Sequence, residues 1–204
     1  MPRATKTRPA SLPMTVASAI ESQSLPFWEI GKPQAVFETL ANQENIVGDV
    51  LDIGCGTGEN ALMLALRGHM VWGIDISEKA IATARQKSVD YQAEATFVVG
   101  NALELEVLGE GFHTVIDSGL FHFLTDKERK KYLRGLAHVM FPGSRFYLLC
   151  MSEHEPGEEG PRRISRKELE KTFEAGWKIH RIEASSFETR THQAQAWLVT
   201  IERL

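Results

Sequence analysis

Short apolar runs alternate with amphipathic stretches along most of the chain. The apolar runs predict strands at 49–53, 71–76, 96–99, 114–117, 145–151, 177–182 and 196–201. The amphipathic stretches predict helices at 33–42, 60–67, 77–86 and 125–140, and another beginning at 165. Strands that alternate with helices indicate an α/β fold with a mostly parallel sheet and helices on both faces. Ligands of such sheets bind beyond the carboxyl ends of the strands.

The length and composition indicate one globular domain. The 204 residues are 43% hydrophobic and 25% charged, enough for a single sizeable core. We expect a polar, proline-punctuated mobile arm at 1–24 and one domain at 25–204. Arg3, Lys6 and Arg8 without nearby acids resemble a transit peptide, but three prolines interrupt the helix that such a signal needs.

The net charge and the cysteine content indicate which partners and which cellular compartment to expect. The net charge of −4 gives no global basic footprint for nucleic acid, and no apolar run is long enough to span a bilayer. Cys55 and Cys150 are too few for a disulfide framework. We therefore expect a cytoplasmic protein, a monomer or homodimer, that acts on a small molecule and binds neither nucleic acid nor membranes.

Three alternating glycines follow the first predicted strand. Gly54, Gly56 and Gly58 allow a tight turn with positive φ and a close approach of backbone N–H groups to a ligand. Asp75 ends the second strand, 19 residues after Gly56, where a carboxylate can accept hydrogen bonds from both hydroxyls of a ribose. This pairing predicts a nucleoside cofactor.

The residues around the turn argue against a phosphate ligand. The dinucleotide motif requires glycine at position 59, which is Glu59, and no P-loop lysine follows. An acid at the start of a helix repels a pyrophosphate. Asp52, just before the turn, suits a cationic ligand better.

These motifs resemble those of class I S-adenosylmethionine (SAM) methyltransferases. The similarity runs through Val50–Gly58, Gly73–Ser77, Val99–Ala102 and Asp117–Gly119, in the family's order. The resemblance implies a Rossmann-like fold with seven strands, the last of them antiparallel and supplied by Trp197–Ile201.

The resemblance also implies the cofactor, SAM, and its contacts. The three glycines would pack against its methionine portion and ribose, with Asp52 behind them. Asp75 would bind the ribose and Ile76 would lie against the adenine. The family's usual aspartate is replaced by Asn101, whose amide oxygen can still accept from the adenine amino group. Further cofactor contacts are expected at Asn60, Ala102, Asp117 and Ser118.

A narrower resemblance concerns the segment before the first helix. Pro26–Gln34 is similar to the N-terminal segment of the thiopurine, thiol and halide methyltransferases, where aromatic residues fold over the cofactor. It implies cofactor contacts at Trp28 and Gly31, and substrate contacts at Phe27 and Phe121. Alternatively, the aromatic pair 27–28 merely holds the helix entry against the core.

His122 is the candidate catalytic residue. It follows the fourth predicted strand, where a histidine can act as a general base or hydrogen-bond the substrate; a structural histidine is the alternative. The other histidines are scattered, and no metal site is expected. The loop at 153–163 is either a solvated loop or a lid, with Arg162 or Arg163 available to an anionic substrate.

Together these features predict transfer of a methyl group from SAM to a small-molecule nucleophile by in-line displacement. The acceptor atom is left open among sulfur, halide, oxygen and heterocyclic nitrogen. Two alternatives remain at this stage: a nicotinamide-dependent oxidoreductase, and a SAM-binding module without catalytic activity.

Overall fold

A single seven-stranded sheet forms the centre of the computed structural model, which describes residues 26–157 and 159–204. The strand order is β3-β2-β1-β4-β5-β7-β6. β7 pairs antiparallel with both β5 and β6, whereas the other neighbouring strands are parallel. The predicted reversal of the last strand is therefore confirmed. The strands are β1 (Val50–Ile53), β2 (Val71–Asp75), β3 (Ala95–Val99), β4 (Phe112–Ser118), β5 (Met140–Met151), β6 (Trp177–Glu188) and β7 (Gln193–Arg203).

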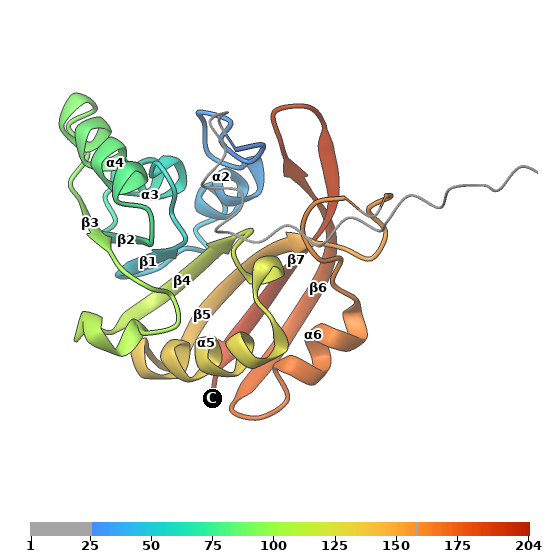
Figure 1. The fold of residues 1–204 in the computed structure, drawn as a ribbon. Coiled ribbons are helices and arrows are strands. Elements are labelled where there is room, and N and C mark those ends of the chain that lie inside the picture. The colour runs from blue at the N-terminus through green and yellow to red at the C-terminus, as the bar shows by residue number, and fades with distance from the viewer. Residues whose placement is uncertain (1–25, 158) are drawn as a thin grey trace, which may run out of the picture.

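Helices cover both faces of this sheet, as predicted (Figure 1). On one face lie α2 (Ala35–Asn42), α3 (Glu59–Ala65) and α4 (Glu78–Asp90); on the other lie α5 (Asp126–Val139) and α6 (Arg166–Thr172). Two short 3-10 helices, η1 (Leu105–Leu108) and η2 (Phe121–Phe123), follow β3 and β4.

The period-two alternation of the strands divides the core into two clusters. Val50 and Ile116 point to the layer of α2, α3 and α4, where they pack with Phe37. Leu51 and Val115 point to the opposite layer, which includes Tyr132 and Leu136 of α5. Because consecutive side chains of a strand face opposite sides, a strand buried on both faces must be apolar throughout. This explains the short continuous apolar runs in the sequence.

Side-chain caps fix where the helices begin. Ser77 and Thr125 accept hydrogen bonds from the backbone amides of Ala80 and Glu128. Thr125 and Glu128 form a complete capping box. Ser165 caps α6, but the carboxylate of Glu168, three residues later, pairs with arginines and not with the Ser165 backbone.

Several element bounds differ from the sequence-based prediction. β5 begins at Met140, five residues before the predicted strand at 145–151, and runs through Pro142 and Gly143 at an irregularity in its pairing with β4. β6 and β7 continue well past their apolar cores to the turn at 189–192, where exposed polar residues hide the strand pattern. α4 extends to Asp90 on a solvent-facing surface.

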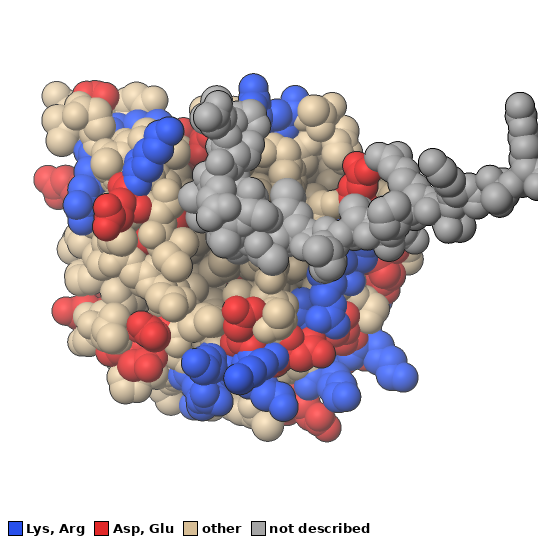
Figure 2. All heavy atoms as spheres, viewed as in Figure 1, with Lys and Arg blue, Asp and Glu red and all other residues tan. Residues whose placement is uncertain are grey.

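Lys and Arg side chains gather over α5 and α6 (Figure 2). Acids interrupt this group, because Asp126 and Glu168 both pair with Arg162. None of the helices in the described ranges is long and apolar enough to cross a membrane. The expected arm at 1–24 lies outside the described residues.

Candidate functional site

The glycine turn between β1 and α3 is left-handed at three positions. Gly54, Gly56 and Gly58 have φ values of 70°, 54° and 89°, which only glycine adopts without strain. A Cβ at Gly58 would lie 2.8 Å from Cζ of Phe97, whereas a Cβ at Gly56 would meet nothing within 4 Å. Gly58 is thus needed for packing, and Gly56 faces open space where a ligand can approach the backbone.

Asp75 joins the glycine turn to the end of β2. Its Oδ2 accepts a hydrogen bond from the Gly56 amide at 2.9 Å, and its Oδ1 accepts one from the Ser77 amide at 2.8 Å. Each carboxylate oxygen keeps a second lone pair for a ligand. Burial raises the pKa of Asp75. The adjacent Ile76 side chain is 57% exposed, so it is available to a flat ligand.

Asp52 is a fully buried carboxyl group beneath the turn. Neither of its oxygens has a hydrogen-bond partner among the described residues. Burial, followed by the charges of Asp117 and Asp75, raises its pKa to about 8. A buried, unpartnered acid is costly unless a cation or donor arrives. This arrangement fits the ammonium group of a SAM methionine portion.

Asp117 holds the turn that follows β4. Its carboxylate accepts from the Tyr132 hydroxyl at 2.7 Å and from the Leu120 amide at 2.8 Å. Burial raises its pKa to about 6, against the opposing effect of these hydrogen bonds. The side chain therefore fixes the backbone at Ser118, which lines the cavities described below.

Glu59 has a partner that sequence alone did not reveal. Its carboxylate pairs with Lys87 of α4, and Lys87 also donates to the Thr57 hydroxyl at 2.8 Å. The acid at the start of α3 is therefore neutralised. The argument from Glu59 against a pyrophosphate ligand is therefore weaker, because Lys87, 28 positions away in the chain, compensates its negative charge.

Two small cavities meet at the glycine turn. The first, of about 50 Å³, lies over the turn and is lined by Gly54, Gly56 and Asn60, among others. The second, of about 60 Å³, is mostly aromatic. Both are lined by Trp28, Gly54, Ser118 and Phe187. The lining of the second cavity is completed by Phe27, Gly119, Leu120, His122 and Phe123.

The segment 26–34 is fastened over these cavities. Both carboxylate oxygens of Glu29 accept from the Thr57 hydroxyl at 3.0 Å. The Gln34 side chain exchanges two hydrogen bonds with the backbone of Glu188, at 2.8 and 2.9 Å. Trp28 packs edge-on against Phe123. Segments far apart in sequence thus close one side of the site.

His122 is buried and neutral. Its Nδ1 accepts a hydrogen bond from the Met151 backbone amide at 3.1 Å. Burial, followed by repulsion from Arg163 and Arg129, lowers its pKa to about 3. Since Nδ1 accepts, the ring proton is assigned to Nε2. These features oppose the predicted general base and favour a hydrogen-bond donor.

Phe121 does not line the site. It is fully buried, stacked on Phe173 and covered by the guanidinium of Arg129. The prediction of a substrate contact at Phe121 was therefore wrong, because η2 turns this ring into the core beside α5. Its neighbours His122 and Phe123 line the cavity instead.

The remaining expected cofactor residues lie at the same edge of the sheet. Asn101 and Ala102 follow β3 and are half-buried. The Asn101 Oδ1 already accepts from the Leu103 amide at 2.9 Å. Gly31 is exposed, with a φ of 69°.

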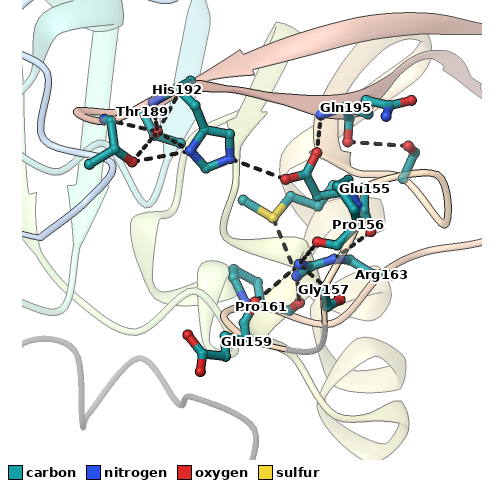
Figure 3. Close-up of polar contacts among 12 residues, drawn as sticks. Glu155, Pro156, Gly157, Glu159, Pro161, Arg163, Thr189, His192 and Gln195 are labelled. Atoms are coloured by element: carbon teal, nitrogen blue, oxygen red, sulfur yellow. Dashed lines mark hydrogen bonds and ion pairs between the residues drawn. The ribbon is translucent and has the colours of Figure 1, made fainter.

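The loop at 153–163 is organised by one arginine (Figure 3). Arg163 donates to five backbone carbonyls of this loop. The Glu155 carboxylate accepts from the backbone N–H of Gln195 and also contacts Nε2 of His192. Arg162 pairs with Asp126 and Glu168. Both arginines that were candidates for contact with an anionic substrate therefore have structural partners.

Sequence reasoning missed several lining residues. Phe187 lies in a polar stretch and Phe123 in a short turn, and neither carries a recognisable motif. Gln34 and Lys87 act through contacts that only the folded chain creates. In the part of the chain that the structure describes, no group of His, Cys, Asp or Glu is arranged to hold a metal.

Comparisons with known proteins identify the family. A methyltransferase domain model matches residues 50–143. The 2-heptyl-1-hydroxyquinolin-4(1H)-one methyltransferase of Mycobacteroides abscessus is 34% identical over 76% of this chain and 69% of its own length.

Solved structures show the same fold. A protein described for the conversion of a disulfide bond into a thioacetal group during echinomycin biosynthesis is 34% identical, with a TM-score of 0.79 over 87% of this chain and 85% of its own. The SAM-bound magnesium protoporphyrin IX methyltransferase of Synechocystis PCC 6803 is 24% identical, with a TM-score of 0.64 over 81% of this chain and 76% of its own.

The chain belongs to the class I SAM-dependent methyltransferases. It is an enzyme of this class and uses SAM as its cofactor. The family assignment decides against the nicotinamide and non-catalytic alternatives.

Proposed function

We propose that this enzyme methylates a small, flat, largely apolar molecule held in the aromatic cavity beside the glycine turn. The observation that carries this proposal is the lining of that cavity by Phe27, Trp28, Phe123 and Phe187. Aromatic rings at an apolar site favour planar ligands through stacked and edge-on contacts. The cavity shares Gly54 and Ser118 with the cavity over the turn, so an acceptor there would lie next to the cofactor.

We assign the cofactor contacts as follows. The Asp75 carboxylate binds the ribose hydroxyls, and Ile76 packs on the adenine. Asp52 and the backbone oxygens of Asp117 and Ser118 attract the methionine ammonium. Asn101 and Ala102 contact the edge of the adenine. The backbone of the turn approaches the cofactor at Gly54, Gly56 and Gly58. The side of the pocket is formed by Trp28, Gly31 and Asn60.

The protein's own contribution is alignment and exclusion of water. SAM supplies an electrophilic methyl group on its sulfonium sulfur. The aromatic segment 26–34 and the turn after β4 hold the acceptor in line with that group, which removes the entropic cost of the encounter. Cavities of about 50 and 60 Å³ are too small for both ligands. We therefore infer that the segment around Trp28 moves outward for binding and then closes over both ligands.

Two groups of similar methyltransferases favour different acceptor atoms. The aromatic N-terminal segment resembles that of the thiopurine, thiol and halide methyltransferases, which favours a soft sulfur or halide acceptor. The relative from Mycobacteroides abscessus is named for a 1-hydroxyquinolone, which favours an oxygen on a heteroaromatic ring. The aromatic lining offers ring contacts to aryl thiols and hydroxyquinolones that iodide cannot make, which favours an aryl acceptor.

The test is formation of S-adenosylhomocysteine from SAM across a panel of acceptors, with the methylated product identified by mass. The panel holds iodide, alkyl thiols, an aryl thiol, phenols, N-heterocycles and 2-heptyl-1-hydroxyquinolin-4(1H)-one. We expect turnover with aromatic acceptors and little with iodide or alkyl thiols. A Phe123→Ala variant should raise KM for the acceptor and leave SAM affinity within about twofold, since Phe123 lines the aromatic cavity but not the cavity over the turn. Turnover restricted to iodide or alkyl thiols would contradict the proposal.

A further inference from the structure

His122 presents a hydrogen-bond donor to the aromatic cavity. The Met151 amide occupies Nδ1, and Nε2 has no partner among the described residues. His122 is itself a lining residue of the cavity, and its ring is held edge-on between Phe123 and Phe187. Among the described residues, the rest of the side-chain lining is apolar apart from the Ser118 hydroxyl and the indole N–H of Trp28. A donor in such surroundings is available to an oxygen, sulfur or nitrogen acceptor of the ligand.

A positive charge that no described carboxylate neutralises lies behind this donor. The guanidinium of Arg163 makes its hydrogen bonds to carbonyl oxygens (Figure 3), and no ion pair joins it to an acid among the described residues. It also reaches the sulfur of Met151 at 3.7 Å, the residue whose amide holds His122. Arg129 is the second cation that acts on the imidazole, but it is paired with Glu168.

The electrostatic field of Arg163 and Arg129 also acts on any ligand that contacts Nε2 of His122. Arg163 and Arg129 oppose a positive charge on the imidazole, so they favour a negative charge beside it. Low polarity around the cavity strengthens this effect relative to water. Glu155, whose backbone carbonyl accepts from Arg163, directs its carboxylate to His192 and the Gln195 backbone amide instead.

We propose that the acceptor is an aromatic compound that binds as its conjugate base, with the anionic atom or its conjugated oxygen hydrogen-bonded to Nε2–H of His122. This inference rests on the proposed function of the cavity. The acceptor loses its proton to solvent before it binds. Its anion attacks the methyl carbon, the carbon–sulfur bond breaks, and the electron pair stays on the sulfur of S-adenosylhomocysteine. No proton is moved by the protein, and His122 is a binding residue and not a base.

The experiment compares two ligands that differ in one acidic group. 2-Heptyl-1-hydroxyquinolin-4(1H)-one carries an acidic N-hydroxyl group, and 2-heptylquinolin-4(1H)-one lacks it. Affinity for the enzyme saturated with S-adenosylhomocysteine is measured by tryptophan fluorescence between pH 5 and 9, which requires no turnover. We expect affinity for the hydroxy compound to rise about tenfold per pH unit up to the ligand's own pKa and then level off. Affinity for the second compound should stay flat.

Variants at position 122 separate the donor from a structural role. His122→Ala should weaken binding of the ionised ligand by about tenfold and leave the neutral ligand within about twofold. His122→Gln, which retains an N–H at similar reach, should restore most of the lost affinity. If His122→Ala does not fold, the pH series with the wild-type enzyme decides alone.

Three outcomes would overturn the inference. They are equal affinity for both ligands, a pH dependence that is the same for both, and no binding of either by the enzyme saturated with S-adenosylhomocysteine. The proposed function fails separately, when no aromatic acceptor is methylated. Methylation of an acceptor that binds only in its neutral form would leave the proposed function standing and contradict the anionic acceptor.

Discussion

The backbone amide of Gly56 donates a hydrogen bond to Oδ2 of Asp75 at 2.9 Å, which ties the turn after β1 to the end of β2. The two residues are 19 positions apart in sequence and meet because β1 and β2 are parallel neighbours. This bond holds the turn in place before a ligand arrives. The backbone that approaches the cofactor and the carboxylate assigned to its ribose are therefore one preorganised unit.

Replacing Asp75 should remove both parts of this unit. Asp75→Ala deletes the ribose acceptor and the anchor of the Gly56 amide, so we expect SAM affinity to fall by about 100-fold, given charged hydrogen bonds of about 1.5–3 kcal/mol each. Asp75→Asn, which keeps one acceptor oxygen, should lose about tenfold. Isothermal titration calorimetry measures both. Unchanged affinity in the alanine variant would refute the ribose assignment.

Alanine variants of two comparable glycines can separate an effect on ligand binding from an effect of backbone strain. Gly56 and Gly68 both have positive φ, and a Cβ at either would meet nothing within 4 Å. Alanine at either position should destabilise the fold by roughly 1–2 kcal/mol through the left-handed backbone. Only Gly56→Ala should also lower SAM affinity, because the added methyl group projects into the approach to the turn. Thermal unfolding and SAM titration of both variants check this; equal loss of affinity would contradict it.

Asp52 should make stability depend on pH. Its pKa is about 8 in the folded protein, against 3.8 for an ordinary aspartate. Because the pKa of Asp52 is higher in the folded than in the unfolded protein, folding favours its protonated form over the carboxylate. The stabilisation is therefore complete below about pH 4 and is lost as the pH rises toward 8.

The neutral analogue Asp52→Asn should remove this dependence. At pH 8 we expect it to raise the free energy of unfolding by on the order of 2 kcal/mol, while SAM affinity falls because the ammonium loses its partner. Denaturant unfolding at pH 5 and pH 8 gives the comparison, with Asp49→Asn at a half-exposed position as the control. An Asp52→Asn variant that parallels wild type at both pH values would contradict the burial argument.

Gln34 should hold the aromatic segment closed. Its side chain is 5% exposed and makes two hydrogen bonds to the Glu188 backbone. Gln34→Ala should destabilise the protein by about 1–3 kcal/mol, since buried partners are left unsatisfied. The exposed Gln86, whose side chain donates to Asp90 on the same helix, is the matched control, and its alanine variant should change stability by less than about 0.5 kcal/mol.

The sequence by itself determined the architecture and the cofactor, and it predicted which residues would bind that cofactor. Apolar runs such as 71–75 must be buried on both faces, so their alternation with amphipathic helices specifies a parallel sheet. The glycine turn and Asp75 could be placed because neighbouring strands end at the same edge. These signals are local in sequence, which is why periodicity and spacing reveal them.

Only the tertiary structure decided which side chains meet at the acceptor site. Phe187, from β6, reaches the cavity across the sheet, and Phe121 turns away from it although its neighbour His122 does not. Lys87 neutralises Glu59, and Met151 occupies the nitrogen of His122 that a general base would need. Each contact joins segments well separated in sequence. Such contacts depend on how the helices and loops pack on the sheet, and no pattern along the chain encodes them.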